Sequence, residues 1–233
     1  MTMAKPIIWI EGLIGSGKSR MTEQLRQSLG YRAFQEPVAE GGYLELFYKD
    51  PKRWAFSFQV EMLKRRWDLH RLATLEARCG TTEGCILDRG MPGDRVFAWL
   101  NYQAGNMHTL EWETYEALYS EFMSIPNLQP TVLLYLDVHP QVALKRIAVR
   151  ARDGEGAVTE AYLTDLRDAY ERLLVQIEGG HHPWASGMRV VRVPWSLDNQ
   201  PIGPIVAQVQ SALPAYRETR RSTPAPIQSR LAL

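Results

Sequence analysis

The sequence contains no long hydrophobic run. No window approaches the ~20 apolar residues of a membrane-spanning helix. The first apolar stretch ends at Glu11, which is too early for the core of a secretory signal peptide. We therefore expect a cytoplasmic protein without a membrane partner.

The sequence also has few cysteines and almost no net charge. Cys79 and Cys85 are the only two cysteines, and no companion His or Cys stands at zinc-ligand spacing. The 27 Lys and Arg residues nearly balance the 26 Asp and Glu residues, so the formal net charge is +1. This balance gives no reason to expect nucleic acid as a partner. The polarity that binds a ligand must come from a local site, and we expect a small-molecule substrate.

The strongest motif lies near the N-terminus, where residues 7–19 read IIWIEGLIGSGKS. A strand-like run leads into the pattern G-x-x-x-x-G-K-S, whose glycines let backbone N–H groups turn inward around phosphate. The Lys adds a point charge, and the Ser hydroxyl is suited to Mg²⁺. An ordinary Gly-rich turn is the alternative, but the β-branched residues before the loop and the helix formers after it supply the required context. We predict that ATP binds through Gly12, Leu13, Ile14, Gly15, Ser16, Gly17, Lys18 and Ser19, with Ser19 on the metal.

The rest of the chain alternates β-rich runs with longer amphipathic stretches, which is typical of an α/β fold around a parallel sheet. A chain of 233 residues can bury one full core, and we expect a single domain over 1–213. From Pro214 the sequence turns polar and Pro-rich, which predicts a mobile tail over 214–233. The expected strands are 6–10, 31–34, 85–87, 131–138 and 188–193, and the expected helices are 18–29, 52–78, 111–123, 140–150, 159–178 and 201–213.

Charged residues follow several expected strands. Because ligands of open parallel sheets bind beyond the carboxyl ends of the strands, these residues are expected to converge on one site. Glu36 follows the second strand, Asp88 and Arg89 follow the third, and the helix after the fourth leads to Arg146, Arg150 and Arg152. The arginine-rich segment 146–156 begins helical and ends in Asp and Gly, as a closing lid does; the alternative is a solvated basic helix face. The set favours phosphoryl transfer.

At this point the sequence resembles the deoxynucleoside kinases of the deoxycytidine, deoxyguanosine and deoxyadenosine kinase type, from Ile7 to about Val193. The resemblance implies a P-loop kinase fold with a five-stranded parallel sheet flanked by helices, a homodimer, and ATP-dependent phosphorylation of the 5′-hydroxyl of a deoxynucleoside. The motifs that carry it are residues 10–19, Glu36-Pro37-Val38, residues 48–51 (YKDP), residues 54–59 (WAFSFQ), Asp88-Arg89 with Asp94-Arg95, and Arg146 to Glu155 followed by Tyr162-Leu163.

The resemblance also implies roles for single residues. Glu36 is expected to contact the 5′-hydroxyl and accept its proton, with Asp88 nearer the magnesium, although the reverse assignment stays open. Asp88 and Arg89 occupy the family's Glu-Arg-Ser element, and this chain departs from it with Asp88 for Glu and Gly90 for Ser. Lys18 is expected to hold the outer phosphates of the donor. Arg146 and Arg150 are expected on the donor, and Arg150 and Arg152 are expected to close over the transferred group.

The nucleoside itself is expected to bind along the long helix 52–78. Tyr48 and Glu155 look like the pair that holds the 3′-hydroxyl, and Gln59 like the amide that reads the base. Helical spacing places Gln59, Met62 and Arg66 on one face, although solvated polar residues around a core Met would share that spacing. Asp94 is placed to pair with Arg66. Such a site favours purine or cytosine deoxynucleosides over thymidine, because an aspartate accepts hydrogen bonds from an exocyclic amino group.

Two other functions remain alternatives. A nucleoside monophosphate kinase of the thymidylate kinase type shares the phosphate loop but needs a cationic site for the phosphate of its acceptor. A non-catalytic P-loop switch protein binds nucleotide without an acceptor. The carboxylates near the expected acceptor site argue against both.

Overall fold

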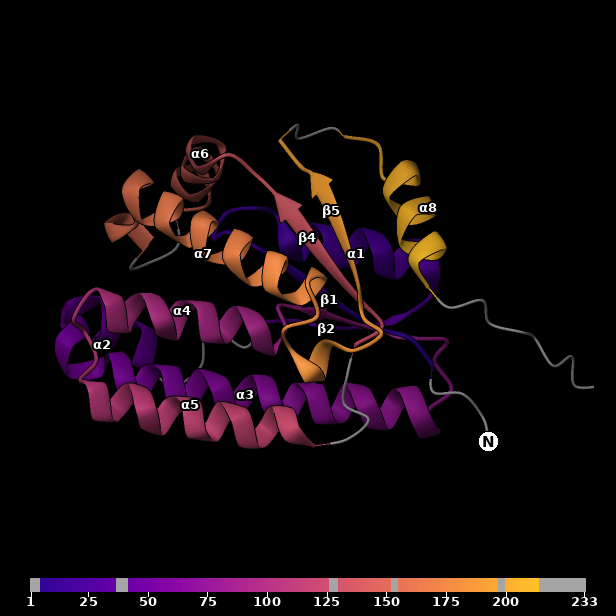
Figure 1. The fold of residues 1–233 in the computed structure, drawn as a ribbon. Helices are drawn as coiled ribbons and strands as arrows, with labels where there is room; N and C mark the ends of the chain where they lie inside the picture. The colour runs from indigo at the N-terminus through magenta and orange to yellow at the C-terminus, as the bar shows by residue number, and fades with distance from the viewer. Residues whose placement is uncertain (1–4, 37–41, 126–129, 152–154, 197–199, 214–233) are drawn as a thin grey trace, which may run out of the picture.

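The computed structural model describes residues 5–36, 42–125, 130–151, 155–196 and 200–213. Its centre is a sheet with strand order β2-β3-β1-β4-β5, in which every neighbouring pair is parallel (Figure 1). The expectation of an α/β fold with five parallel strands is therefore confirmed. The strands are β1 Ile7–Gly12, β2 Arg32–Phe34, β3 Cys85–Asp88, β4 Val132–Asp137 and β5 Arg189–Pro194.

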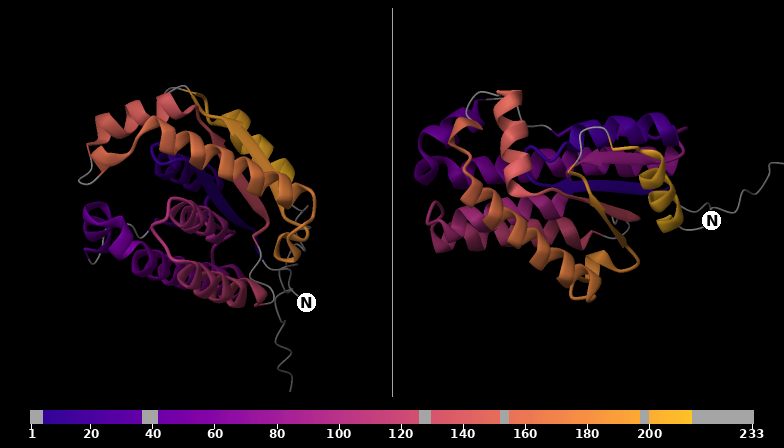
Figure 2. Two further views of the ribbon diagram at one scale, coloured as in Figure 1. Left: turned by 60° about the vertical axis from the view of Figure 1, so that its left-hand side comes forward. Right: turned by 90° about the horizontal axis from the view of Figure 1, so that it is seen from above.

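Helices flank this sheet. The described helices are α1 Lys18–Leu29, α2 Tyr43–Lys49, α3 Pro51–Cys79, α4 Met91–Gln103, α5 Thr109–Ser124, α6 Pro140–Arg150, α7 Glu160–Glu178 and α8 Gly203–Ala212, with short 3-10 turns η1 Glu155–Ala157 and η2 Pro183–Ala185. Helix α7 lies on the opposite side of the strands from α1 (Figure 2). Helices α3, α4 and α5 pack on one another beside β1 and β3.

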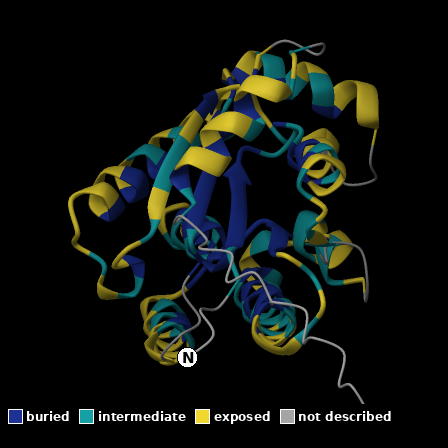
Figure 3. Ribbon diagram, turned by 90° about the vertical axis from the view of Figure 1, so that its right-hand side faces the viewer, coloured by how far each residue is buried: buried dark blue, intermediate teal, exposed yellow. Residues whose placement is uncertain are grey.

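The central strands are buried on both faces, as parallel strands covered by helices must be (Figure 3). All residues of β1 are buried, and Trp9, Tyr135 and Tyr170 are among the largest enclosed side chains. The outward sides of the helices carry most of the exposed residues. In the part of the chain that the structure describes, each helix is too short or too polar to cross a bilayer.

Two helices differ from the sequence-based expectation, which placed none at α2 or α4. Helix α2 has only 7 residues, which is too short for a helical period to be recognised in the sequence. Helix α4 opens with Met91, Pro92 and Gly93, and Pro and Gly are weak helix formers in an interior. In the first turn, however, the missing N–H of Pro has no partner to lose. The proposed tail 214–233 lies outside the described residues.

Candidate functional site

The phosphate loop joins β1 to α1 and depends on its glycines. Gly12, Gly15 and Gly17 all have positive φ, at 150°, 75° and 91°. A methyl carbon at position 15 would also lie 2.5 Å from the carbonyl oxygen of Ala143 in α6. The loop can therefore follow this path, pressed against α6, only with glycine. Arg146 of α6 reaches the same loop and donates from Nη1 to the Ser16 carbonyl at 3.3 Å and to the Trp195 carbonyl at 3.1 Å.

Lys18 and Ser19 begin helix α1 at the end of this loop. The Lys18 ammonium is buried and donates to the Leu13 carbonyl at 2.9 Å and to the Gly12 carbonyl at 3.4 Å. Burial, reinforced by the charge of Arg89, lowers the pKa of Lys18 to about 8.

The Ser19 hydroxyl meets Asp88 at the end of β3. Ser19 Oγ donates to Asp88 Oδ2 at 2.5 Å. Burial raises the pKa of Asp88, although Lys18 opposes this shift. The other carboxylate oxygen, Oδ1, is buried without a hydrogen-bond partner among the described residues. Within the described ranges, no group of three or more His, Cys, Asp or Glu side chains is arranged so that it could hold a metal ion by itself. A hydroxyl and one carboxylate nevertheless fit Mg²⁺, which usually binds through one or two carboxylates together with substrate phosphates and water.

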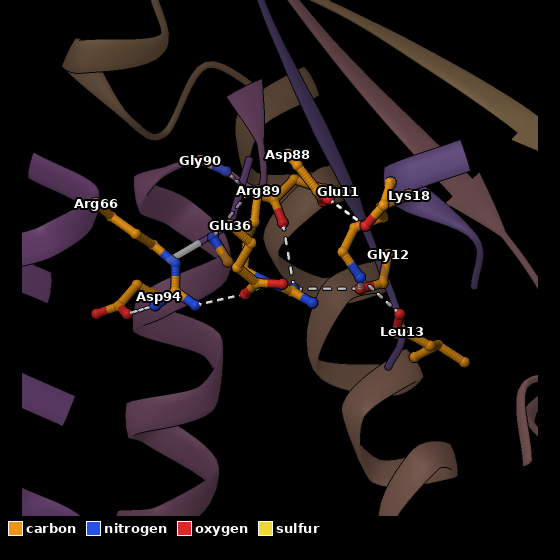
Figure 4. Close-up of polar contacts among 12 residues, drawn as sticks. Glu11, Gly12, Leu13, Lys18, Glu36, Arg66, Asp88, Arg89, Gly90 and Asp94 are labelled. Atoms are coloured by element: carbon orange, nitrogen blue, oxygen red, sulfur yellow. Dashed lines mark hydrogen bonds and ion pairs between the residues drawn. The ribbon is translucent and has the colours of Figure 1, made fainter. Parts of the chain in front are cut away.

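A second carboxylate, Glu36, lies between two arginines. Its Oε1 accepts from Arg89 Nε and from Arg66 Nη2, both at 2.7 Å (Figure 4). Burial tends to raise the pKa of Glu36, but the charges of Arg89 and Arg66 outweigh it and hold the pKa below its ordinary value. Arg66 also pairs with Asp94, whose other oxygen accepts from the Tyr115 hydroxyl at 2.5 Å. The predicted pairing of Arg66 with Asp94 is confirmed.

One cavity of about 910 Å³ connects these groups. The phosphate loop lies at one part of its wall, and Gln59, Met62 and Arg66 of α3 line another, as their helical spacing predicts. Aromatic side chains from several elements complete the wall. The lining includes Ile14, Gly15, Gly17, Lys18, Ser19, Glu36, Phe47, Tyr48, Phe58, Gln59, Met62, Arg66, Asp88, Arg89, Phe97, Arg150 and Tyr162.

Some predicted residues lie elsewhere. Asp94 is fully buried and stands behind Arg66 rather than on the cavity wall. Tyr162, named above only as part of a family motif, is half-buried, packs against the core and also lines the cavity. Arg152, Pro37 and Val38 lie outside the described residues. Of Glu155 the structure describes the backbone, in η1.

Two residues that contact this network were not predicted from the sequence. Glu11 at the end of β1 accepts from the Tyr170 hydroxyl at 2.9 Å, and Tyr170 in turn accepts from Arg89. The signal for Glu11 was a charged residue at the end of an apolar strand. Tyr170 carried no such signal, because a tyrosine in an apolar helical stripe is typical of an ordinary core residue.

The parallel sheet, the phosphate loop and the adjoining cavity with two carboxylates are the architecture of a P-loop kinase fold. The family model for deoxynucleoside kinases matches residues 8–207, and the chain belongs to this family. This result confirms the resemblance found in the sequence.

The individual proteins that the chain resembles are also deoxynucleoside kinases. The chain is 34% identical over 191 residues to a deoxyguanosine kinase of Dictyostelium discoideum, over 82% of this chain and 64% of that protein. The chain thus spans less than two thirds of that relative. It is 34% identical over 192 residues to a deoxyadenosine kinase of the same organism, over 81% of this chain and 72% of the relative. The structure of deoxyadenosine kinase from M. mycoides with bound dCTP matches with a TM-score of 0.73 and 29% identity, over 88% of this chain and 99% of that one.

Proposed function

We propose that this protein transfers the γ-phosphate of ATP to the 5′-hydroxyl of a deoxynucleoside, giving the 5′-monophosphate. The observation that carries the proposal is the single cavity that runs from Lys18 and Ser19 to Glu36, Tyr48 and Gln59. A donor site and an acceptor site that share one cavity bring the two reacting groups together, which is the main contribution of a protein to phosphoryl transfer. The similarity to a deoxyadenosine kinase that binds dCTP supports this assignment.

In this proposal the donor lies on the phosphate loop. The backbone of residues 12–17 cradles the phosphates, and Lys18 holds the outer ones. Ser19 and Asp88 hold Mg²⁺, which supplies charge neutralisation on the phosphates when it is bound. Arg150, the last residue of α6, and Arg152 beyond it close over the transferred group. Arg146 braces the loop through the hydrogen bond from its guanidinium to the Ser16 carbonyl.

The acceptor lies between Glu36 and the long helix α3. Glu36, whose lowered pKa keeps it ionised, accepts a hydrogen bond from the 5′-hydroxyl and then its proton, while Arg89 fixes the carboxylate. Asp88 is the alternative base, because burial raises its pKa and makes it the stronger proton acceptor of the two. Tyr48 and Glu155 hold the 3′-hydroxyl. Gln59 and Met62 contact the base, and Arg66, backed by Asp94, sets the polarity at its edge.

The same geometry argues against a monophosphate acceptor. Arg66 and Arg89 both donate to Glu36, so their charges are already compensated by a carboxylate. A phosphate placed beside Glu36 would meet a negative charge. A switch protein is disfavoured because it has no use for an acceptor cavity.

We also propose that the protein is a single-domain homodimer in the cytoplasm. The family resemblance supports the dimer. Sedimentation equilibrium would report twice the chain mass of 26.6 kDa if it is correct.

The test of the function is a panel of acceptors with radiolabelled ATP. The panel contains the four deoxynucleosides and their 5′-monophosphates, each with the wild-type protein. We expect label in the monophosphate products of deoxyadenosine, deoxyguanosine or deoxycytidine. Label in diphosphates would support the thymidylate kinase alternative, and nucleotide binding without transfer to any acceptor would support a switch protein.

A further inference from the structure

Glu11 is a buried carboxylate that the proposed chemistry does not use. It is the last but one residue of strand β1, is fully enclosed and does not line the cavity. Its Oε1 accepts from the backbone N–H of Gly90 at 2.8 Å and of Gly93 at 3.2 Å. Its Oε2 accepts from the Tyr170 hydroxyl at 2.9 Å. One side chain thus joins β1, the start of α4 and helix α7.

The contact with α4 acts as a helix cap supplied from another element. Gly90 is the N-cap of α4 and has no side chain to accept from the first N–H groups. Glu11 accepts from two of them and places negative charge at the positive end of the helix. The fit is close, because a methyl group at Gly93 would overlap the Glu11 carboxylate. Glu11 therefore fixes the segment that follows Arg89.

Arg89 itself has an uncommon backbone conformation, with φ at 72°. A non-glycine residue in this left-handed region is strained, so surrounding contacts must hold it. Its backbone N–H donates to the Ile10 carbonyl at 3.0 Å. Its guanidinium donates to the Gly12 carbonyl at 3.2 Å, to the Tyr170 hydroxyl and to Glu36.

These contacts form a relay from the cavity to Glu11, and Figure 4 shows its start, where Arg89 lies against Glu36. Glu36 is bonded to Arg89, Arg89 donates to Tyr170, and Tyr170 donates to Glu11. Burial raises the pKa of Tyr170 well above its ordinary value, so its hydroxyl keeps the proton that it donates. Arg89 Nη1 also lies 3.6 Å from Glu11 Oε2, so this one cation faces a carboxylate on each side.

We propose that Glu11, acting through Tyr170, is a positioning residue for phosphoryl transfer that sets the orientation of Arg89 and thereby of the Glu36 carboxylate. This inference rests on the proposed function, since it assigns to Arg89 and Glu36 their place beside the acceptor hydroxyl. Glu11 touches neither substrate. Its contribution therefore falls on the rate of transfer and not on the binding of the nucleoside.

The test uses Glu11→Gln and Tyr170→Phe in the full-length protein. Glutamine keeps the shape and an oxygen for the α4 cap but removes the charge, and phenylalanine removes the hydroxyl of the relay. A misplaced reacting group costs up to about a hundredfold in rate, so we expect each variant to lose about ten- to a hundredfold in kcat, with the nucleoside KM within about threefold. Glu11→Gln should also lower the melting temperature, because the charge that it removes faces the start of α4 and Arg89, so kcat is measured at a temperature at which circular dichroism shows the variant folded.

Tyr135→Phe is the matched control. Tyr135 of β4 is buried, its ring centroid lies 5.5 Å from that of Tyr170, and its hydroxyl has no hydrogen-bond partner among the described residues. The same substitution there leaves the relay intact, and kcat should be unchanged.

A double-mutant cycle with Arg89→Lys tests whether Glu11 affects kcat through Arg89 or independently of it. If Glu11 acts through Arg89, then Glu11→Gln adds little further loss of kcat in the Arg89→Lys background. Any of three results would overturn the inference. These are a wild-type kcat in Glu11→Gln, losses of kcat that multiply in the double-mutant cycle, and a loss of kcat in Tyr135→Phe equal to that in Tyr170→Phe. Should Arg89→Lys fail to fold, the Glu11→Gln and Tyr170→Phe double variant replaces it, with no greater loss expected than in the worse single variant. A wild-type protein that phosphorylates no nucleoside would instead reject the proposed function.

Discussion

Lys18 is the residue that the donor side of the site depends on most directly. It is buried beside the loop carbonyls, where a point charge is weakly screened. We expect Lys18→Ala to lower kcat on the order of a hundredfold, equivalent to about 3 kcal/mol of transition-state stabilisation. Steady-state kinetics on the folded variant, verified by circular dichroism, measures this. Lys64→Ala, on the exposed side of α3, is the control and should keep full activity; near wild-type turnover in Lys18→Ala would contradict the kinase assignment.

Arg66 is the residue that links base recognition to the acceptor carboxylate. Its guanidinium pairs with Asp94 on one side and donates to Glu36 on the other. We expect the wild-type protein to prefer deoxyadenosine, deoxyguanosine or deoxycytidine over thymidine, because buried polar groups left unpaired by the wrong base cost roughly 1–3 kcal/mol.

Replacing Arg66 by Met and Asp94 by Ala together should narrow this preference. The loss of the Glu36 contact lowers kcat for every base, so the measured quantity is the ratio of kcat/KM between deoxyadenosine and thymidine, in which a common loss cancels. An unchanged ratio, or a wild-type protein with its highest kcat/KM on thymidine, would show that this pair does not select the base.

The sequence predicted single residues well where chemistry follows from a local pattern. Gly12 to Ser19 form a contiguous motif, and Gln59, Met62 and Arg66 share one helix face. The Glu11–Tyr170 contact spans 159 positions and carries no motif, so nothing in the local pattern could reveal it. Asp94 was expected in the pocket, yet it lies behind Arg66, with its carboxylate bonded to Arg66 and Tyr115.

At the scale of elements, the phosphate loop and α6 fit together only because position 15 has no side chain. We expect Gly15→Ala to destabilise the protein by about 1–2 kcal/mol through its positive φ and by about a further 1–3 kcal/mol through the overlap with Ala143. Gly105→Ala is the matched control, since Gly105 has a φ of 71° and no atom within 4 Å of its added carbon. Urea titration compares the two variants, and equal losses would show that the contact with α6 is not tight.

Arg150, at the end of α6, is proposed to close over the transferred phosphoryl group. We expect Arg150→Ala to lower kcat at least about tenfold while nucleoside affinity stays within about twofold, because its charge is needed most as the phosphoryl group moves. The same split is expected for Arg152→Ala. Lys145→Ala, an exposed cation on the same helix, serves as the control. A collapse of nucleoside affinity in calorimetry, with single-turnover rates unchanged, would assign these arginines to binding.

Helices with a clear hydrophobic period were predicted from the sequence, and helices in which no such period could be recognised were missed. Helix α3 was expected at 52–78 and runs from Pro51 to Cys79. Helix α4 was missed because its first turn contains Pro and Gly, and its stability comes partly from the Glu11 carboxylate on another strand. A helix whose cap is supplied from elsewhere in the fold cannot be read from its own sequence.

For the whole molecule, the acceptor cavity is assembled from segments far apart in the chain. Tyr48, Gln59, Arg89 and Tyr162 come from α2, α3, the end of β3 and α7. The parallel sheet brings them together because its strands end at one edge. The sequence could predict that edge, whereas the aromatic lining depends on how the helices pack above it.

The central claim is that the acceptor atom is the 5′-oxygen of a deoxynucleoside. The most direct measurement compares the best deoxynucleoside of the panel with its 5′-deoxy analogue, which keeps the base and the 3′-hydroxyl, using γ-labelled ATP and the wild-type protein. The account predicts label in the 5′-monophosphate of the nucleoside and none in the analogue. Label in the analogue, or release of inorganic phosphate alone with both compounds, would contradict it.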